Sequence, residues 1–242
     1  MRTLLTALTA FMLFATPVVA GDSAKEIERN FNLGWAAYQA GNYRTAFLLW
    51  EPIAEFGVAD VQFNLGQMYS NGKGVRQDYA VAMHWYRKAS VQGNADAQFA
   101  LGQMYHEGRG IQTNAEKAAH WYREAAKQGN KYAQFYLGVM YDNGEGVYAN
   151  ATKAAHWYRE AAKQGMSNAQ FNIGIAYGKG SGVLKDYVKS YAWLYLAAAR
   201  GNQLAKSHIG VLDKNLGRQK IANGRELAAQ YWRLYVEPFA GD

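Results

Sequence analysis

The chain has 242 residues, of which 26 are Lys or Arg and 19 are Asp or Glu, so its formal net charge is +7 at pH 7. Half of the residues are hydrophobic, which excludes a wholly disordered chain. The sequence has no cysteine, so disulfides, thiolate zinc sites, iron–sulfur clusters and a cysteine nucleophile are excluded as well.

The first twenty residues have the pattern of a cleaved secretory signal. A basic start is followed by an uncharged, Leu- and Ala-rich stretch over residues 4–15, and small residues at Val18 and Ala20 suit signal peptidase. We therefore expect residues 1–20 to be a signal peptide, with a mature periplasmic or secreted chain that starts at Gly21. A membrane anchor is the alternative, but the apolar run is about 12 residues long and a span needs about 20.

From residue 57 onward the sequence repeats itself every 36 residues, and an earlier unit that opens at Leu33 and Gly34 is four residues shorter. The motif Leu65-Gly66-Gln67-Met68-Tyr69 recurs at 101–105 and 137–141, and a looser copy follows at 173–177. A fixed period of about 20–50 residues is typical of a solenoid of stacked supersecondary units. Residues that recur at the same spacing are Trp85, Trp121, Trp157 and Trp193, and Gly57, Gly93, Gly129, Gly165 and Gly201.

Each unit divides into two predicted helices joined by a glycine turn. In the first full unit the spacing predicts a helix over 59–70, a turn over 71–75 and a second helix over 78–92 that closes at Gly93. Glycine in the turn and after the second helix supplies positive φ at low steric cost. The sequence therefore predicts an all-α chain built from helix pairs.

These motifs carry a family resemblance. The pattern L-G-x-M-Y-x-x-G-x-G-V, followed by A-x-x-W-Y and A-x-x-G, resembles the Sel-1-like repeat, a relative of the tetratricopeptide repeat. The resemblance is close over residues 59–201 and loose over residues 31–57. It implies a right-handed α-solenoid of stacked helix pairs, and an exported bacterial protein with a non-enzymatic role in assembling or regulating envelope complexes.

The repeat register sets the expected domain organisation. After the signal peptide, a tetratricopeptide-like unit begins with a helix that starts at Ser23, where Glu26 completes a capping box. Four repeats and a C-terminal helical cap follow. The unit spans residues 21–57, the repeats span 58–93, 94–129, 130–165 and 166–201, and the cap spans 202–242.

One arc of each first helix varies between units while the other positions repeat. In tetratricopeptide-like superhelices the first helices line the concave surface, which usually binds partners, so we expect this variable arc to be the binding face. Tyrosines at its middle are the predicted anchor, although they could instead simply cover the neighbouring helix. The variable arc consists of Asp60, Asn64, Gln67, Asp96, Ala100, Gln103, Tyr132, Tyr136, Val139, Asn168, Asn172 and Ile175.

The second helices are predicted to be amphipathic. At about 100° per residue, the alanines, tryptophan and tyrosine equivalent to Ala82, Trp85, Tyr86 and Ala89 form a core stripe, and the opposite side is polar. A glycine inside each first helix, such as Gly66, is expected to let a Trp or Tyr of the second helix approach closely.

The last repeat departs from this pattern. Its second helix carries apolar residues on the outer side, at Ala192, Tyr195, Leu196 and Ala199. An apolar outer face should be covered, and we expect helices near 203–215 and 219–236 to cover it. A docking site for a partner or a second copy is the alternative.

The candidate chemical motifs predict no catalytic, metal or cofactor site. His84, His120 and His156 recur at one position, but packed helices lie about 8–10 Å apart, too far for shared zinc ligands at about 2.0–2.1 Å. Ser70 and Lys73 spell S-x-x-K, yet the S-D-N and K-T-G partner motifs are absent from the sequence.

The leading functional prediction is an exported, non-enzymatic scaffold or adaptor that binds protein partners through its concave face. A carbohydrate or peptidoglycan binder is the alternative, favoured by the 18 tyrosines and seven tryptophans. A β-lactamase-like hydrolase ranks third, since no nucleophile–base pair is evident. Mixed charges on an exported chain do not favour nucleic acid, and no later segment suits a membrane span.

Overall fold

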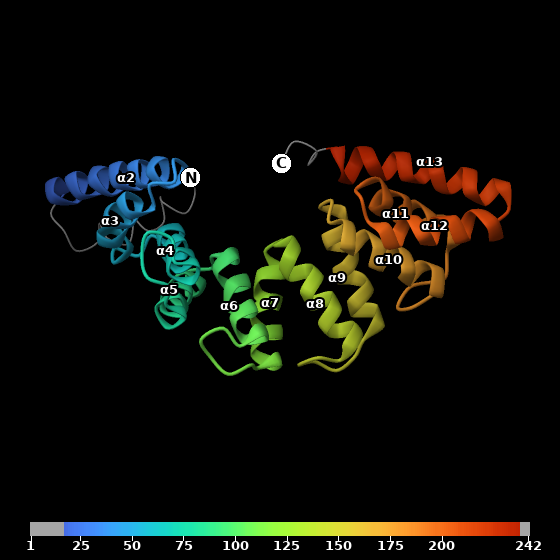
Figure 1. Ribbon diagram of the computed structural model, residues 1–242, viewed down its shortest axis with the longest axis horizontal. Coiled ribbons are helices and arrows are strands. Elements are labelled where there is room, and N and C mark those ends of the chain that lie inside the picture. The colour runs from blue at the N-terminus through green and yellow to red at the C-terminus, as the bar shows by residue number, and fades with distance from the viewer. Residues whose placement is uncertain (1–16, 238–242) are drawn as a thin grey trace. The chain divides into compact units, whose positions relative to one another are not determined.

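The computed structural model describes residues 17–237, which form twelve helices, α2 to α13, and no strand within that range (Figure 1). The chain divides into two compact units, one ending at Asn114 and the other beginning at Ala115. Among the described helices, none combines the length and apolar character needed to cross a bilayer. The prediction of an all-α repeat solenoid is confirmed.

In the described part of the first unit, residues 17–114, there are five helices, and each packs on the next along the chain. A core forms where α2 and α3 meet α4 and α5, around the fully buried Trp50, Leu65 and Met68. The helices are α2 (Pro17–Gln39), α3 (Tyr43–Ala54), α4 (Ala59–Asn71), α5 (Tyr79–Val91) and α6 (Ala95–Glu107).

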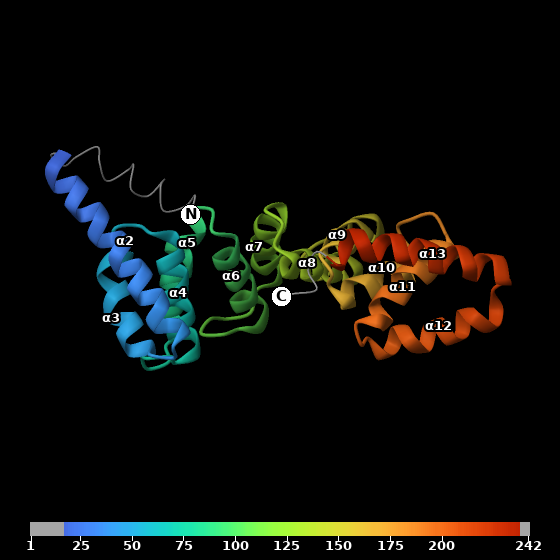
Figure 2. The ribbon, with the colours of Figure 1, turned by 90° about the horizontal axis from the view of Figure 1, so that it is seen from above.

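The second unit contains the remaining seven helices. Consecutive helices pack together from α7 to α11, and both α12 and α13 then pack on α11, which lies between them in Figure 2. The helices are α7 (Ala115–Lys127), α8 (Lys131–Asn143), α9 (Ala151–Lys163), α10 (Ser167–Lys179), α11 (Tyr187–Ala199), α12 (Gln203–Asn215) and α13 (Arg218–Tyr235).

Local sequence explains where these helices begin and end. Asn94 and Asn130 cap α6 and α8 by accepting a backbone N–H at 2.8 and 2.9 Å. The first helices end at left-handed glycines, such as Gly72 with φ of 67°.

The predicted helix start at Ser23 is wrong, because α2 begins at Pro17. Proline suits the first turn of a helix, where its missing N–H costs nothing. Most of the predicted signal peptide, residues 1–16, lies outside the described residues.

The glycines inside the first helices allow the predicted close approach. A Cβ added to Gly66 would lie 2.5 Å from the Tyr86 ring, and one on Gly138 would lie 2.7 Å from the Tyr158 ring. In the last repeat Leu194 takes the place of the aromatic ring, at 2.8 Å from a Cβ on Gly174. In these three helix pairs, a side chain of the second helix therefore rests on the bare backbone of the first.

The predicted tryptophan stripe is only partly correct. Trp85 and Trp193 are buried, with 7% and 2% exposure, but Trp121 and Trp157 are half-buried. Trp193 differs because α13 covers it, with the Tyr231 and Tyr235 rings 4.6 and 5.7 Å from its indole. The two half-buried indoles lie at the edge of the core stripe, so the neighbouring alanines and tyrosine make the core there.

The outer face of the last repeat is covered in part. Ala192 and Leu196 are fully buried in α11, on which α12 and α13 pack. Tyr195 remains 44% exposed, and Ala199 is exposed as well. The C-terminal helices therefore act as a cap over the apolar side of the fourth repeat.

Candidate functional site

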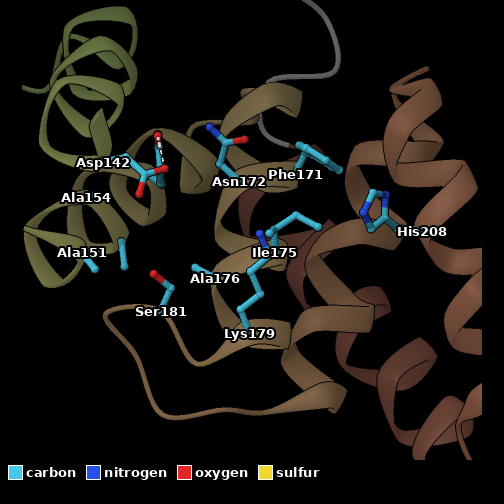
Figure 3. Close-up of a pocket in the computed structure, with 12 residues that line it drawn as sticks. Asp142, Ala151, Ala154, Phe171, Asn172, Ile175, Ala176, Lys179, Ser181 and His208 are labelled. Atoms are coloured by element: carbon cyan, nitrogen blue, oxygen red, sulfur yellow. Dashed lines mark hydrogen bonds between the residues drawn. The ribbon is translucent and has the colours of Figure 1, made fainter. Parts of the chain in front are cut away.

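The second unit contains a pocket of about 310 Å³ between α8, α9, α10 and α12, which we call the fourth-repeat pocket (Figure 3). Its floor is apolar and consists mainly of Ala154, Ala155, Phe171, Ile175 and Ala176. Its polar lining is formed by Asp142, Tyr158, Asn172, Lys179, Ser181 and His208.

The pocket lies where the repeat departs from its own pattern. Ala176 occupies the position held by Met68, Met104 and Met140 in the preceding repeats, where the methionine side chains are buried. Alanine leaves the space of a methionine side chain unfilled. On the facing helix α9 the lining residues include small ones such as Ala154, which do not fill this space.

One wall of the pocket is held by a buried tyrosine. The Tyr158 hydroxyl donates to Oδ2 of Asp142 at 3.4 Å. Burial raises the pKa of Tyr158, and the nearby Asp142 carboxylate raises it further. The phenol therefore stays neutral at physiological pH and serves as a hydrogen-bond donor rather than a base.

The opposite wall carries an imidazole. The His208 ring meets the Phe171 ring edge-on, at 5.4 Å between centroids, and His208 Nδ1 lies 2.8 Å from the Leu204 carbonyl oxygen. Together with Asn172 and Lys179, this wall offers donors, acceptors and charge around an apolar floor. Such a lining suits one bulky apolar side chain and the peptide backbone that flanks it.

Two residues of the variable arc line this pocket, Asn172 and Ile175. The predicted anchor lies elsewhere on α8. Tyr136 is half-buried and stacks on Tyr122 of α7 at 5.4 Å, so it covers the neighbouring helix. Tyr132 is 48% exposed, with the Lys131 ammonium 5.6 Å from its ring.

The rest of the arc is mostly polar and mostly half-buried. Asn168 in α10 is exposed and accepts from Asn202 Nδ2 at 3.2 Å. In the first unit, Asp60 accepts from Asn94 Nδ2 at 3.0 Å, and Asn64 is buried with 9% exposure. Asp96 is exposed, and the half-buried members are Asp60, Gln67, Ala100, Gln103 and Val139.

The S-x-x-K motif does not form a serine–lysine pair. The Lys73 ammonium lies over the rings of Tyr38 and Tyr43, at 5.5 and 4.9 Å. These two phenols raise the pKa of Lys73, which favours its charged form. A lysine acting as a general base must instead be neutral.

The histidines equivalent to His84 lie beside the repeat tryptophans rather than together. The His84, His120 and His156 rings meet Trp85, Trp121 and Trp157 edge-on, at 5.4, 5.1 and 4.8 Å. Within residues 17–237, no group of three or more His, Cys, Asp or Glu side chains is placed to hold a metal ion.

Sequence reasoning missed most of the polar lining of the pocket. Asp142, Lys179 and Ser181 follow the arc near the helix ends, and His208 comes from the cap. The sequence feature that marks the pocket is Ala176, which stands where the three preceding repeats have methionine.

Comparison with known proteins identifies the repeat. The family model of the Sel1 repeat matches residues 59–94, 95–130, 131–166 and 167–202. None of the curated proteins compared matches the chain.

Two solved structures are similar over most of this chain. A Sel1 repeat protein from Oxalobacter formigenes is 30% identical, with a TM-score of 0.72 over 82% of this chain and 84% of that one. The protective antigen c5321 of uropathogenic Escherichia coli, which has an SLR fold, is 26% identical, with a TM-score of 0.50 over 90% of this chain and 64% of that one. Four consecutive family matches over more than half of the chain, on stacked helix pairs, show that the chain belongs to the Sel1 repeat family.

Proposed function

We propose that this chain is an exported adaptor that binds a segment of a partner protein in the fourth-repeat pocket and thereby assembles or regulates an envelope complex. Sel1 repeat proteins generally mediate protein–protein interactions, and their scaffold is typically non-catalytic. The observation that carries the proposal is the pocket itself, an apolar floor with a polar lining on the α10 arc that the sequence marks as variable.

The size of the pocket favours an anchoring side chain. A volume of about 310 Å³ is at the lower end of the range of about 300–1,000 Å³ for small-molecule sites. A Leu, Met or Phe side chain of a partner fits the apolar floor, while Asn172 and Asp142 can bond its backbone. Apolar anchors in such pockets contribute much of the binding energy at interfaces.

Export is the part of the proposal that rests on the N-terminal sequence. A basic start, the apolar stretch over residues 4–15 and the small residues Val18 and Ala20 support a signal peptide. A periplasmic or secreted location would place the partner in the envelope or outside the cell.

Ala176→Met tests the pocket directly, because it restores the residue that three other repeats carry at this position. The methionine should fill the pocket and weaken partner binding about tenfold or more. The partner is first captured by cross-linking in the envelope fraction, then purified and titrated against each variant.

Leu184→Ala is the matched control, since Leu184 is 91% exposed in the α10–α11 turn and does not line the pocket. It should bind the partner as the wild type does, and both variants should retain the wild-type melting temperature. Unchanged binding by Ala176→Met would show that the fourth-repeat pocket is not the binding site. Binding of the wild type to purified peptidoglycan, with no protein partner, would favour the glycan alternative instead.

A further inference from the structure

A second groove of the second unit lies beside the turn between α8 and α9, and we call it the turn groove. It has a volume of about 610 Å³ and is lined by Arg123 of α7, Tyr141 of α8, Tyr148 of the turn and Lys153 of α9, among others. Arg123 donates to the Tyr141 hydroxyl at 3.3 Å, and the Lys153 ammonium lies 5.2 Å from the Tyr141 ring.

The same arrangement recurs 36 residues later with Arg159, Tyr177 and Lys189. The Arg159 guanidinium and the Lys189 ammonium lie 5.8 and 5.5 Å from the Tyr177 ring. The copy of the groove in the fourth repeat is therefore built from the same three side-chain types in the same order.

In the fourth repeat this place is occupied by the chain itself. Tyr231 of α13 packs 4.6 Å from the Trp193 ring, and Tyr235 stacks on the same indole at 5.7 Å. Burial raises the pKa of Tyr231, and the neighbours that also act on it include Tyr177, Asp186 and Arg159. The side chain of Tyr231 thus lies among the groups that repeat the turn groove.

One repeat earlier the equivalent place is open. Trp157 is the equivalent of Trp193, but it is half-buried, whereas Trp193 is 2% exposed. Within the second unit, the arrangement of Arg, Tyr, Lys and Trp side chains on which α13 places its tyrosines is therefore complete twice, and α13 covers one of the two copies.

We propose that the turn groove together with Trp157 is a second docking site, for a helical segment of a partner protein that carries tyrosine and acidic side chains. The tyrosine would rest on Trp157 as Tyr231 rests on Trp193.

The acidic character follows from the charges of the groove and of α9. Lys153 is exposed, and the α9 equivalents of Ala192 and Leu196 are His156 and Glu160, of which Glu160 is already paired with Lys163 at 2.8 Å. In the groove, Arg123 and Lys153 outnumber the single acidic lining residue, Glu116. Carboxylates on the incoming helix would complement this charge.

The probe is a fluorescein-labelled synthetic peptide of residues 224–237 carrying R225E and R233E, titrated against the full mature chain by anisotropy. It presents the two tyrosines of α13 on an acidic helix. We expect saturable binding, and a loss of about tenfold or more when the tyrosines are replaced by Y231A and Y235A in the peptide. In the protein, Lys153→Glu should weaken binding by a similar factor, and because Lys153 is exposed the variant should fold normally.

Two charge-matched protein variants serve as controls. Lys206→Glu in α12 makes the same charge change outside the groove, and Lys189→Glu alters the place that α13 already fills. Both should bind the peptide as the wild type does. The absence of saturable binding, or equal binding of the two peptides, would overturn the proposal.

Two further results would also overturn it. A loss in Lys189→Glu but not in Lys153→Glu would mean that the peptide displaces α13. Self-association of the wild type that Lys153→Glu abolishes would make the occupant a second copy, and sedimentation velocity would detect it.

Discussion

Glycines and one alanine shape the helix pairs through the side chains that they lack. Gly138 lets the Tyr158 ring rest on α8, and that ring in turn forms a wall of the fourth-repeat pocket. Gly210 in α12 occupies the equivalent position at the end of the array, but a Cβ there would meet nothing within 4 Å. The same residue type at the same repeat position therefore has a packing role only where the next helix packs against it, and α13 packs on α11 instead.

Gly138→Ala and Gly210→Ala should accordingly change stability in opposite directions. The first adds a methyl 2.7 Å from the Tyr158 ring and should cost about 1–3 kcal/mol by overpacking. The second should add about 0.5–1 kcal/mol, because alanine is the better helix former and space is free. Urea denaturation measures both, and equal effects would contradict the contact argument.

The buried tyrosines predict a loss of stability in alkali. Burial raises the pKa of Tyr86 from 10.0 to about 12, with Ser70 and Arg109 opposing the rise. The unfolded chain ionises this phenol near pH 10, so its contribution is complete below that pH and is lost as pH rises from 10 to about 12.

Tyr86→Phe should therefore lose less stability than the wild type over this pH window. Tyr148→Phe is the control, because Tyr148 is 97% exposed and should leave the alkaline loss unchanged. The urea midpoint, followed from neutral pH into this window, compares the three proteins. Identical pH profiles for wild type and Tyr86→Phe would show that ionisation of this phenol does not contribute to the alkaline loss of stability.

Among whole elements, α13 has the clearest effect on its surroundings. It converts one tryptophan of the repeat series from an edge residue into a core residue, since Trp193 is 2% exposed and Trp157 is half-buried. The other cap helix, α12, also packs on α11 but buries less, and Ala205 is the one buried hydrophobic residue of α12.

Truncating these two tryptophans compares the covered and uncovered positions. Trp193→Ala should cost about 3–5 kcal/mol, because it removes a fully packed indole and leaves a cavity beneath α13. Trp157→Ala should cost clearly less, since solvent already reaches its ring. Guanidinium unfolding gives both values, and a greater loss for Trp157→Ala would mean that α13 does not stabilise the fourth repeat.

At the scale of the whole molecule, each unit is a series of nearest-neighbour contacts tied by one repeated polar bond. Gln62, Gln98, Gln134 and Gln170 are buried, and each side-chain amide donates to the carbonyl eight residues earlier, at 2.8 to 3.2 Å. The bond links the start of one repeat to the end of the preceding helix. Repeat arrays derive their stability from such neighbour terms.

The N-terminal processing of the molecule is a separate prediction. If residues 1–20 are removed on export, the isolated protein should begin at Gly21 within the α2 segment. N-terminal sequencing and intact mass of protein from the periplasmic or secreted fraction test this. Recovery of the Met1 form from the membrane fraction would instead indicate an uncleaved anchor.

The sequence by itself determined the helix pairs, the glycine turns between them and the Sel1 repeat, because these depend on residues close together in the chain. A left-handed glycine and a 36-residue spacing have the same local consequence in every copy. The sequence also indicated that the last repeat needs a cover, since apolar residues on an outer helix face favour burial.

Only the tertiary structure decided which of the repeated side chains are core and where a ligand can enter. Tyr136 looked free in the variable arc, yet its ring stacks on Tyr122. The fourth-repeat pocket combines Asp142 with His208 of the cap, two residues that no local pattern relates. Burial and cavities depend on the volumes of the side chains that pack between helices. The helical period predicts which side of a helix a residue lies on, but it does not predict which side chains pack against that residue.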